Sequence, residues 1–260
     1  MSPIYVPGKV TLAKEFTWNE TVWNPSMIST ALWLDAADAS TITESGGAVS
    51  QWDDKSGNNL HATQTSSAAR PLTNSETINN INAISFASQF FDLPDFSNFI
   101  AGSSNRFLFA VGKAASSDSP ILSIGVNSPG TRWTLRVDNY NLRIEISGAS
   151  YVAPNFTVQD YSIAGVGLSG STIGDHTFFL NGVSSAASGT ATVNTNASSE
   201  NYISNSVVGA GSGVWGEFIL LSSYPSEQTR QKLEGYLAHK WGLTANLPSD
   251  HPYKTVGPTP

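Results

Sequence analysis

The chain has 260 residues, of which 40% are hydrophobic and only 13% are charged, so it is long enough for one large β-rich domain with few surface charges. Its formal net charge of −7, with only 13 lysines and arginines, excludes the positively charged surface that nucleic acids require. The absence of cysteine excludes disulfide bonds and thiolate metal sites.

The N-terminal sequence MSPIYVPGKVTLAKEF carries prolines and charges where a signal peptide needs an uninterrupted apolar segment. No segment of the sequence approaches the roughly 18 apolar residues of a membrane span. We therefore expect a protein that has no signal peptide and is not inserted in a membrane.

Residues 1–26 are predicted to form an N-terminal arm, and residues 27–260 one domain with an ordered C-terminal tail. Prolines and a glycine interrupt the arm, yet it contains large apolar side chains that rarely stay exposed together. These are Phe16, Trp18, Val22 and Trp23. They either pack on their own domain or anchor the chain to a particle or to sister subunits, and we predict the anchoring role.

Short apolar runs alternate with turn clusters at intervals of about a dozen residues, a pattern typical of all-β proteins. Strands are predicted over residues 31–34, 83–86, 106–113, 121–126, 133–137, 142–147, 161–168, 176–180, 206–209 and 217–221. Two tight hairpin turns are predicted at residues 138–141 (DNYN) and 181–182 (NG), because asparagine and glycine tolerate the positive φ angles of such turns.

Two further segments lack a clear strand pattern. Residues 184–199 are rich in Ser, Ala and Thr and are predicted to form a long surface connection or an edge strand. The string GSGVWG at residues 211–216 matches the Gly-x-Gly-x-x-Gly spacing of dinucleotide-binding loops, but it precedes an apolar run rather than a helix. We predict a glycine-rich turn there.

One α-helix is predicted, over residues 226–241. Ser226 can accept a hydrogen bond as N-cap, and Gly242 can end the helix. Gly235 indicates that the helix lies close against another backbone, and the helix is expected to cap one end of a β-sandwich. The apolar face consists of Leu233, Tyr236, Leu237 and Trp241.

Sequence motifs of common hydrolases are absent. The four histidines are far apart and form no H-E-x-x-H arrangement, which argues against a zinc hydrolase. The segment GLSGS at residues 167–171 lacks the last glycine of a serine-hydrolase elbow. Glu145, the acid in the strand LRIEIS, is explained by a cross-strand ion pair, so no pair of catalytic carboxylates is predicted.

Acidic residues follow the first strand and Trp52. They are Asp35, Asp38, Asp53 and Asp54, and Asn58 and Asn59 lie just beyond them. Their oxygens are of the kind that calcium prefers, so they are the weak calcium candidates of this chain. Aspartate and asparagine also cap turns through hydrogen bonds to the backbone, and we favour that structural role, with no cofactor expected.

Four segments together resemble a known family: ALWLDAAD (31–38), VSQWDDKSGNNLHATQ (49–64), INAISF (81–86) preceded by RP, and GEFILLSSYPSEQTRQKLEGYLAHKWGL (216–243). They are similar to the concanavalin A-like, laminin-G-type jelly rolls of phage structural proteins and bacterial surface proteins. The resemblance implies an all-β, two-sheet antiparallel jelly-roll sandwich with one C-terminal helix. It also implies that Trp52 lies in the core and that residues 54–57 shape a turn.

The family resemblance and the lack of an export signal lead us to expect a non-enzymatic phage virion structural protein. It would be assembled in the host cytoplasm and displayed on the particle surface, as a capsid decoration or a tail component. Its partners would be other virion proteins, sister subunits and host-surface glycans. The alternative is a free glycan-binding module or a glycoside-active enzyme of a bacterial surface system.

Overall fold

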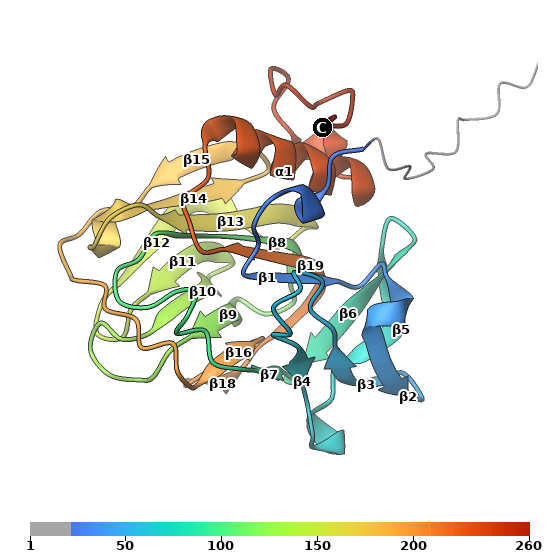
Figure 1. Ribbon diagram of the computed structural model, residues 1–260, viewed down its shortest axis with the longest axis horizontal. Coiled ribbons are helices and arrows are strands. Elements are labelled where there is room, and N and C mark those ends of the chain that lie inside the picture. The colour runs from blue at the N-terminus through green and yellow to red at the C-terminus, as the bar shows by residue number, and fades with distance from the viewer. Residues whose placement is uncertain (1–21, 208) are drawn as a thin grey trace, which may run out of the picture.

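The computed structural model describes residues 22–207 and 209–260. Within these residues the chain is all-β with a single α-helix, as the sequence predicts (Figure 1). The strands are β1 (Leu32–Asp35), β2 (Ile42–Ser45), β3 (Ala48–Trp52), β4 (Ala62–Thr63), β5 (Leu72–Ile78), β6 (Ile81–Ala87), β7 (Phe91–Leu93), β8 (Arg106–Ala114), β9 (Asp118–Ile124), β10 (Trp133–Asp138), β11 (Asn141–Glu145), β12 (Ser150–Thr157), β13 (Ser162–Leu168), β14 (His176–Leu180), β15 (Val183–Ala186), β16 (Asn201–Ile203), β17 (Asn205–Ser206), β18 (Gly209–Ala210) and β19 (Ser212–Leu221). The helix is α1 (Glu227–Lys240), and the 3-10 turns are η1 (Pro25–Met27), η2 (Ala39–Thr41), η3 (Ser67–Ala69), η4 (Ile173–Asp175) and η5 (Thr244–Asn246).

Antiparallel pairing joins 17 of the strands in one strongly bent sheet. One stretch of the sheet runs β15–β14–β13–β8–β19, with β1 and β6 both paired to β19 and β5 paired to β6. The other stretch runs β12–β11–β10–β9–β16–β7–β4–β3–β2. A single residue pair, Ala48 with Leu72, connects the two stretches through β3 and β5.

Both predicted hairpin turns are confirmed. Asp138 pairs with Asn141 across the first turn, and φ is 47° at Asn139 and 63° at Tyr140. The second turn joins β14 to β15 through Asn181 (φ 52°) and Gly182 (φ 86°). These positive φ angles give a turn whose twist matches that of the flanking strands, which fixes the register of both hairpins.

The glycine-rich segment 211–216 was misassigned as a turn, because most of it belongs to the long strand β19. Its glycines serve close packing instead. A Cβ atom on Gly216 would lie 2.6–2.8 Å from atoms of the Trp241 ring, and one on Gly213 would lie 2.7 Å from the Lys113 carbonyl oxygen. The segment predicted as one strand at 206–209 is divided between β17 and β18.

Two apolar clusters hold the fold together. The larger core lies between the two stretches of the sheet and contains Trp52, as the family resemblance implies, together with Trp133 and Trp215. The second cluster lies on the other face of the β13–β8–β19–β1 region, under α1. The strands of this region are therefore buried on both faces, which explains their nearly continuous apolar sequences.

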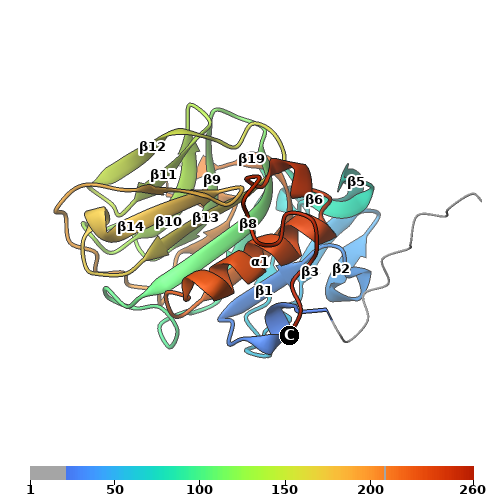
Figure 2. The same ribbon diagram turned by 90° about the horizontal axis from the view of Figure 1, so that it is seen from above.

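Helix α1 begins after Ser226, whose side chain accepts a hydrogen bond from the Thr229 N–H as predicted. The helix lies across the face of the sheet rather than capping one end of it, as Figures 1 and 2 show. Gly235 does mark a close approach, but the neighbour is the Tyr253 side chain rather than a backbone. Among the described residues, no helix has both the length and the apolar character needed to cross a membrane.

Leu233 provides a direct test of the buried face of α1. Its side chain is fully buried in the second cluster, whereas Lys232 is half-buried and donates a hydrogen bond to the Thr259 carbonyl oxygen at 2.9 Å. We expect Leu233→Ala to lower the free energy of unfolding by about 2–5 kcal/mol and Lys232→Ala to lower it by no more than about 1 kcal/mol. Thermal or denaturant melts followed by circular dichroism measure both, and equal stability of the two variants would contradict this packing.

Candidate functional site

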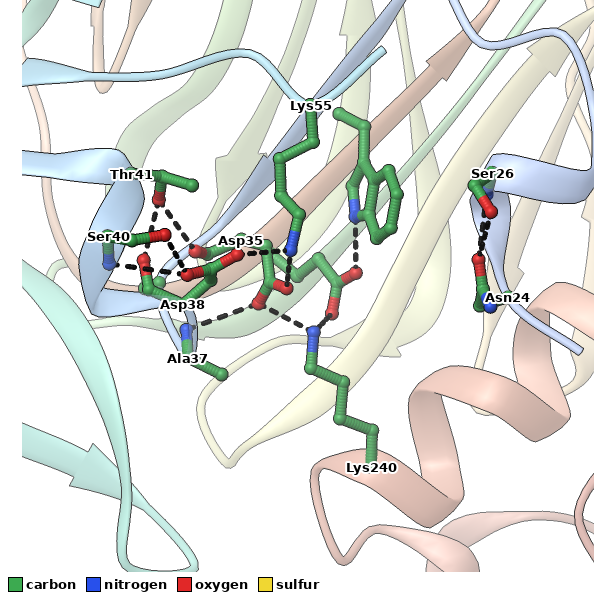
Figure 3. A network of polar contacts seen from close by, with 12 residues as sticks. Asn24, Ser26, Asp35, Ala37, Asp38, Ser40, Thr41, Lys55 and Lys240 are labelled. Carbon is green, nitrogen blue, oxygen red and sulfur yellow. Dashed lines mark hydrogen bonds and ion pairs between the residues drawn. The ribbon is translucent and has the colours of Figure 1, made fainter. Parts of the chain in front are cut away.

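Carboxylates and lysines meet where β1 ends, beside the C-terminal part of α1. Figure 3 shows Lys55 and Lys240 reaching the Asp35 carboxylate from opposite sides. The Nζ–O distances are 3.0 Å for Lys55 and 2.6 Å for Lys240. Lys55 also binds Asp38 at 2.7 Å, so one ammonium group bridges two of the predicted calcium ligands.

Glu217 on β19 forms the buried centre of this carboxylate–lysine network. Its Oε1 accepts hydrogen bonds from the Trp33 indole N–H at 2.7 Å and from the Tyr236 hydroxyl at 3.0 Å. Its Oε2 accepts from Lys240 at 2.8 Å and from the Trp241 indole N–H at 2.7 Å. Burial raises the pKa of Glu217 and Lys240 opposes this effect, while four donors around one carboxyl group favour its ionised form.

Asp38 and Lys55 form the exposed end of the network, and each group favours the charged state of the other. The hydrogen bond from Lys55 lowers the pKa of Asp38, and hydrogen bonds from Ser40 add to this effect. Burial lowers the pKa of Lys55, but the charges of Asp35 and Asp38 outweigh burial and raise it overall. Both partners of the Lys55–Asp38 pair therefore remain charged at neutral pH.

The other two calcium candidates lie apart from this network. Asp54 caps its own turn, as predicted: it accepts hydrogen bonds from the backbone N–H groups of Trp33, Ser56 and Leu60 and from the Ser56 hydroxyl. Asp53 accepts a hydrogen bond from the Gln51 side chain at 2.7 Å. Within the part of the chain that the structure describes, no three acidic or histidine side chains are grouped so that they could hold a metal ion.

A chelator tests the calcium hypothesis directly. Because lysine ammonium groups bridge Asp35 and Asp38, and Asp54 is saturated by its own turn, we expect excess chelator to leave the melting temperature unchanged. A bound ion that prefers the folded state would stabilise it by mass action. A lower melting temperature in chelator, restored by added calcium, would therefore contradict the capping role of these aspartates.

A pocket of about 690 Å³ lies over the carboxylate–lysine network, and we call it the β1 pocket. Its lining residues are Val22, Asn24, Trp33, Asp35, Ala37, Asp38, Lys55, Ile81, Tyr236 and Lys240. Its floor is charged and aromatic, whereas Val22, Ala37 and Ile81 make part of its wall apolar. The pocket is thus within the size range of small-molecule sites.

The four predicted anchoring residues have different positions. Phe16 and Trp18 lie outside the described residues. Trp23 is only 4% exposed: its ring meets Tyr236 edge-on with centroids 6.4 Å apart, and its backbone N–H donates to the Pro258 carbonyl oxygen at 3.2 Å. For Trp23 the structure therefore shows packing on its own domain, the first of the two interpretations. Val22 is half-buried and borders the β1 pocket.

A second candidate surface is the outer face of the β2–β12 stretch. Direct cross-strand partners lie on one face of a sheet, and following them from strand to strand gives an unbroken row of polar residues and one tyrosine. This polar row is Thr43, Gln51, Thr63, Asp92, Tyr202, Ser123, Thr134, Glu145 and Ser150. Alternate residues such as Phe91, Ile203 and Trp133 belong to the core, which places the row on the opposite face.

The middle of the polar row is shaped by an aromatic pair and an acid. Tyr202 is half-buried and packs edge-on against Phe90, with ring centroids 6.1 Å apart. Asp92, its direct partner on β7, is exposed, and partial burial raises the pKa of its carboxyl group. Ser123 and Thr134 continue the row and share a hydrogen bond of 2.7 Å between their hydroxyl groups, but both side chains are buried, so the accessible part of the row ends at Tyr202.

Three arginines surround Glu145 at one end of the row. Arg132 and Arg136 both bind this carboxylate, the second at 3.2 Å, and Arg143 binds it at 3.2 Å from the same strand. Arg136 also pairs with Asp118. The cross-strand ion pair predicted for Glu145 is thus confirmed, with more partners than expected. The Nε–H groups of all three arginines are buried without a partner among the described residues, so the cluster has donors to spare.

Sequence reasoning missed Glu217, Lys240 and the polar row. Glu217 carried a usable signal, because an acid inside the apolar run GEFILL must be buried and therefore must find donors. The polar row carried almost none, since it depends on pairing between short strands such as β4, β7 and β16.

Comparisons with known proteins identify the fold. No family model and no curated protein matches the chain.

Among solved structures, the sialidase of Trypanosoma rangeli is similar at 12% identity and a TM-score of 0.53, over 82% of this chain but only 33% of the sialidase. Domain 4 of AbnA, an extracellular arabinanase from Geobacillus stearothermophilus, in complex with arabinotriose, is similar at 14% identity and a TM-score of 0.57, over 79% of this chain and 98% of that domain. An arabinofuranosidase complexed with arabinofuranosyl-α-1,2-xylobiose is similar at 13% identity and a TM-score of 0.51, over 82% of this chain and 60% of that one.

These similarities concern the fold alone, because the identities are low. The structural neighbours named here are glycoside-active enzymes or a domain of one, and this chain spans only a third of the sialidase. None of the three is a virion protein, so they give no support to the virion role expected from the sequence.

Proposed function

We propose that this chain is a glycan-binding domain without catalytic activity of its own, and that it binds an extended saccharide along the polar row. We also propose that the two stretches of the bent sheet correspond to the two sheets of a jelly-roll sandwich. The β2–β12 stretch would then be the ligand-binding sheet. This is the alternative function that the sequence analysis left open.

The unbroken polar row is the observation that carries the proposal. Its continuous solvent-accessible part runs from Thr43 to Tyr202 across five strands, and four spacings of about 4.8 Å give a track of roughly 19 Å along the sheet. The α-helix of the described residues packs on the other stretch, so it does not cover this face (Figure 2). A polar track that ends at an aromatic pair suits a short chain of sugar units rather than a small apolar ligand.

The side chains of the row supply both kinds of contact that sugars make. The rings of Tyr202 and Phe90 offer apolar surface for the C–H groups of a sugar ring, and Asp92 beside them accepts hydrogen bonds from hydroxyl groups. A structural neighbour also supports the proposal. The chain matches 98% of the length of the arabinanase domain, whose structure contains arabinotriose.

The absence of catalysis is part of the proposal for a physical reason. Glycoside hydrolysis needs two carboxyl groups that can reach the scissile bond. The row contains two acids, Asp92 and Glu145, and Glu145 is buried and held by three arginines, so Asp92 is the one carboxylate of the row that is available to a sugar.

Variants in the middle of the row test the proposal. We expect the chain to bind at least one member of a panel of soluble polysaccharides in affinity electrophoresis or calorimetry. Tyr202→Ala should weaken that binding about tenfold, roughly 1.4 kcal/mol, because it removes the aromatic surface. Asp92→Asn should also weaken it, whereas Asp250→Asn, the same chemical change at an exposed position outside the row, should not.

Unchanged affinity of the Tyr202→Ala variant would show that the saccharide does not lie on the row. Steady release of reducing ends from the bound polysaccharide would contradict the non-catalytic part and leave the binding part intact. The virion role remains a prediction of the sequence resemblance, and a mass-spectrometric inventory of intact particles tests it independently.

A further inference from the structure

The β1 pocket is not used by the proposed function, because none of its ten lining residues belongs to the polar row. Its floor is fixed by internal contacts. Lys240 donates to Asp35, to Glu217 and to the Tyr236 hydroxyl, which uses all three of its N–H donors. A ligand therefore meets a floor that is already organised and needs little rearrangement to bind.

The rim of the pocket still has hydrogen-bonding capacity. Lys55 has three donors, and its contacts with Asp35 and Asp38 use two of them. The side chains of Lys55 and Asp38 are 24% and 34% exposed, and their Nζ and Oδ2 atoms are 2.7 Å apart. A donor and an acceptor thus stand side by side at the pocket mouth, an arrangement that two neighbouring hydroxyl groups match, since each hydroxyl both donates and accepts.

Charge selects against ionic ligands. The lysines Lys55 and Lys240 face three carboxylates, those of Asp35, Asp38 and the buried Glu217, and every one of these charges is already paired. An anion could bind Lys55 only by displacing the Asp38 carboxylate, and a cation could bind Asp38 only by displacing the Lys55 ammonium group. Either would have to break an existing ion pair, whereas a neutral hydroxyl group can add to it.

The remaining wall is apolar. Ile81, Val22 and Ala37 face the pocket together with the aromatic residues Trp33 and Tyr236. Such a wall suits the C–H face of a ring. We propose that the β1 pocket is a second, independent ligand site that binds one neutral sugar unit through two adjacent hydroxyl groups at the Lys55–Asp38 pair.

Nuclear magnetic resonance of the full chain tests this site with simple probes. The probes are methyl α-glucopyranoside, methyl α-mannopyranoside and methyl β-galactopyranoside, with glucuronate and glucosamine as charged analogues. We expect at least one neutral probe to shift the indole N–H signal of Trp33, which donates to Glu217 at the pocket floor. Affinity should be weak, with a Kd on the order of 1 mM for a ligand of this size.

Two variants distinguish the pocket from the rest of the surface. Ala37 is exposed and lines the pocket, so Ala37→Phe should fill it and abolish the shift without removing any side-chain hydrogen bond. Asp38→Asn should weaken binding about tenfold, because a charged acceptor becomes a neutral one. Tyr202→Ala should leave the shift unchanged, so failure of the polar row and failure of the pocket are separate results.

Three outcomes would overturn the proposal. The first is no change at Trp33 with any neutral probe, and the second is a shift that persists in folded Ala37→Phe protein. The third is tighter binding of glucuronate or glucosamine than of the neutral glycosides, which would show that the Lys55–Asp38 pair opens to receive a charge.

Discussion

Replacement of Glu217 by alanine is expected to lower the free energy of unfolding by about 3–5 kcal/mol, because it leaves buried donors without their acceptor. Glu217 is fully buried, and it is the common partner of two indoles, a phenol and an ammonium group. Without it, Lys240 keeps only Asp35 as a charged partner. Each orphaned neutral donor adds on the order of 1 kcal/mol or more to the loss.

Denaturant unfolding followed by tryptophan fluorescence and circular dichroism measures this effect. Glu217→Gln keeps the shape and one of the two acceptor oxygens, so it should be less destabilising than alanine while still leaving Lys240 poorly neutralised. Glu76→Ala is a matched control, since Glu76 is exposed on β5, and it should change stability by less than about 0.5 kcal/mol. Equal stability of the Glu217→Ala and Glu76→Ala variants would show that the carboxylate–lysine network is not a stabilising centre.

Local features of the fold could be predicted because their causes are local. The turn at Asn181-Gly182 depends on which residues tolerate positive φ, and the start of α1 depends on the Ser226 hydroxyl. Glu145 in LRIEIS was expected to form a cross-strand ion pair, and it does so with Arg136 on β10. Such features follow from a few adjacent residues, and the structure confirms them.

Pairing between distant segments could not be predicted in the same way. Trp33 and Glu217 are 184 residues apart in the chain and 2.7 Å apart between their bonded atoms. Strands of two or three residues, such as β4 and β16, have too few positions to show alternation. The glycines of β19 were misread because glycine is needed both in turns and where a ring such as Trp241 lies against a strand.

The candidate site shows the same division. Asp54 could be assigned as a turn cap from the sequence around it, and the structure confirms the cap. Asp35 and Asp38 could be recognised as close together, but Asp35 could not be recognised as a partner of Lys240, which is 205 residues further along the chain. Their apparent suitability for calcium came from local spacing, whereas the lysines that bridge them are set by the tertiary fold.

Replacement of Glu145 by alanine is the second change expected to have a large effect. It would leave Arg132, Arg136 and Arg143 close together without the carboxylate that all three bind. Arg132 and Arg136 are almost fully buried, so their charges cannot simply turn to water. We expect a loss of about 3–5 kcal/mol in the free energy of unfolding, mostly because the buried Arg132 loses its one ion-pair partner among the described residues, while Arg136 keeps only the exposed Asp118.

Salt and a second substitution separate this mechanism from a simple loss of packing. Added salt screens repulsion between like charges, so it should recover part of the stability lost in Glu145→Ala, and less of that lost in Leu233→Ala. Removing one arginine as well, in the Arg136→Ala/Glu145→Ala double variant, should be less destabilising than the sum of the two single changes. Additive effects with no response to salt would mean that the arginines reach other partners once the carboxylate is gone. The polar face would then owe its order to the strand pairing beneath it rather than to this charge cluster.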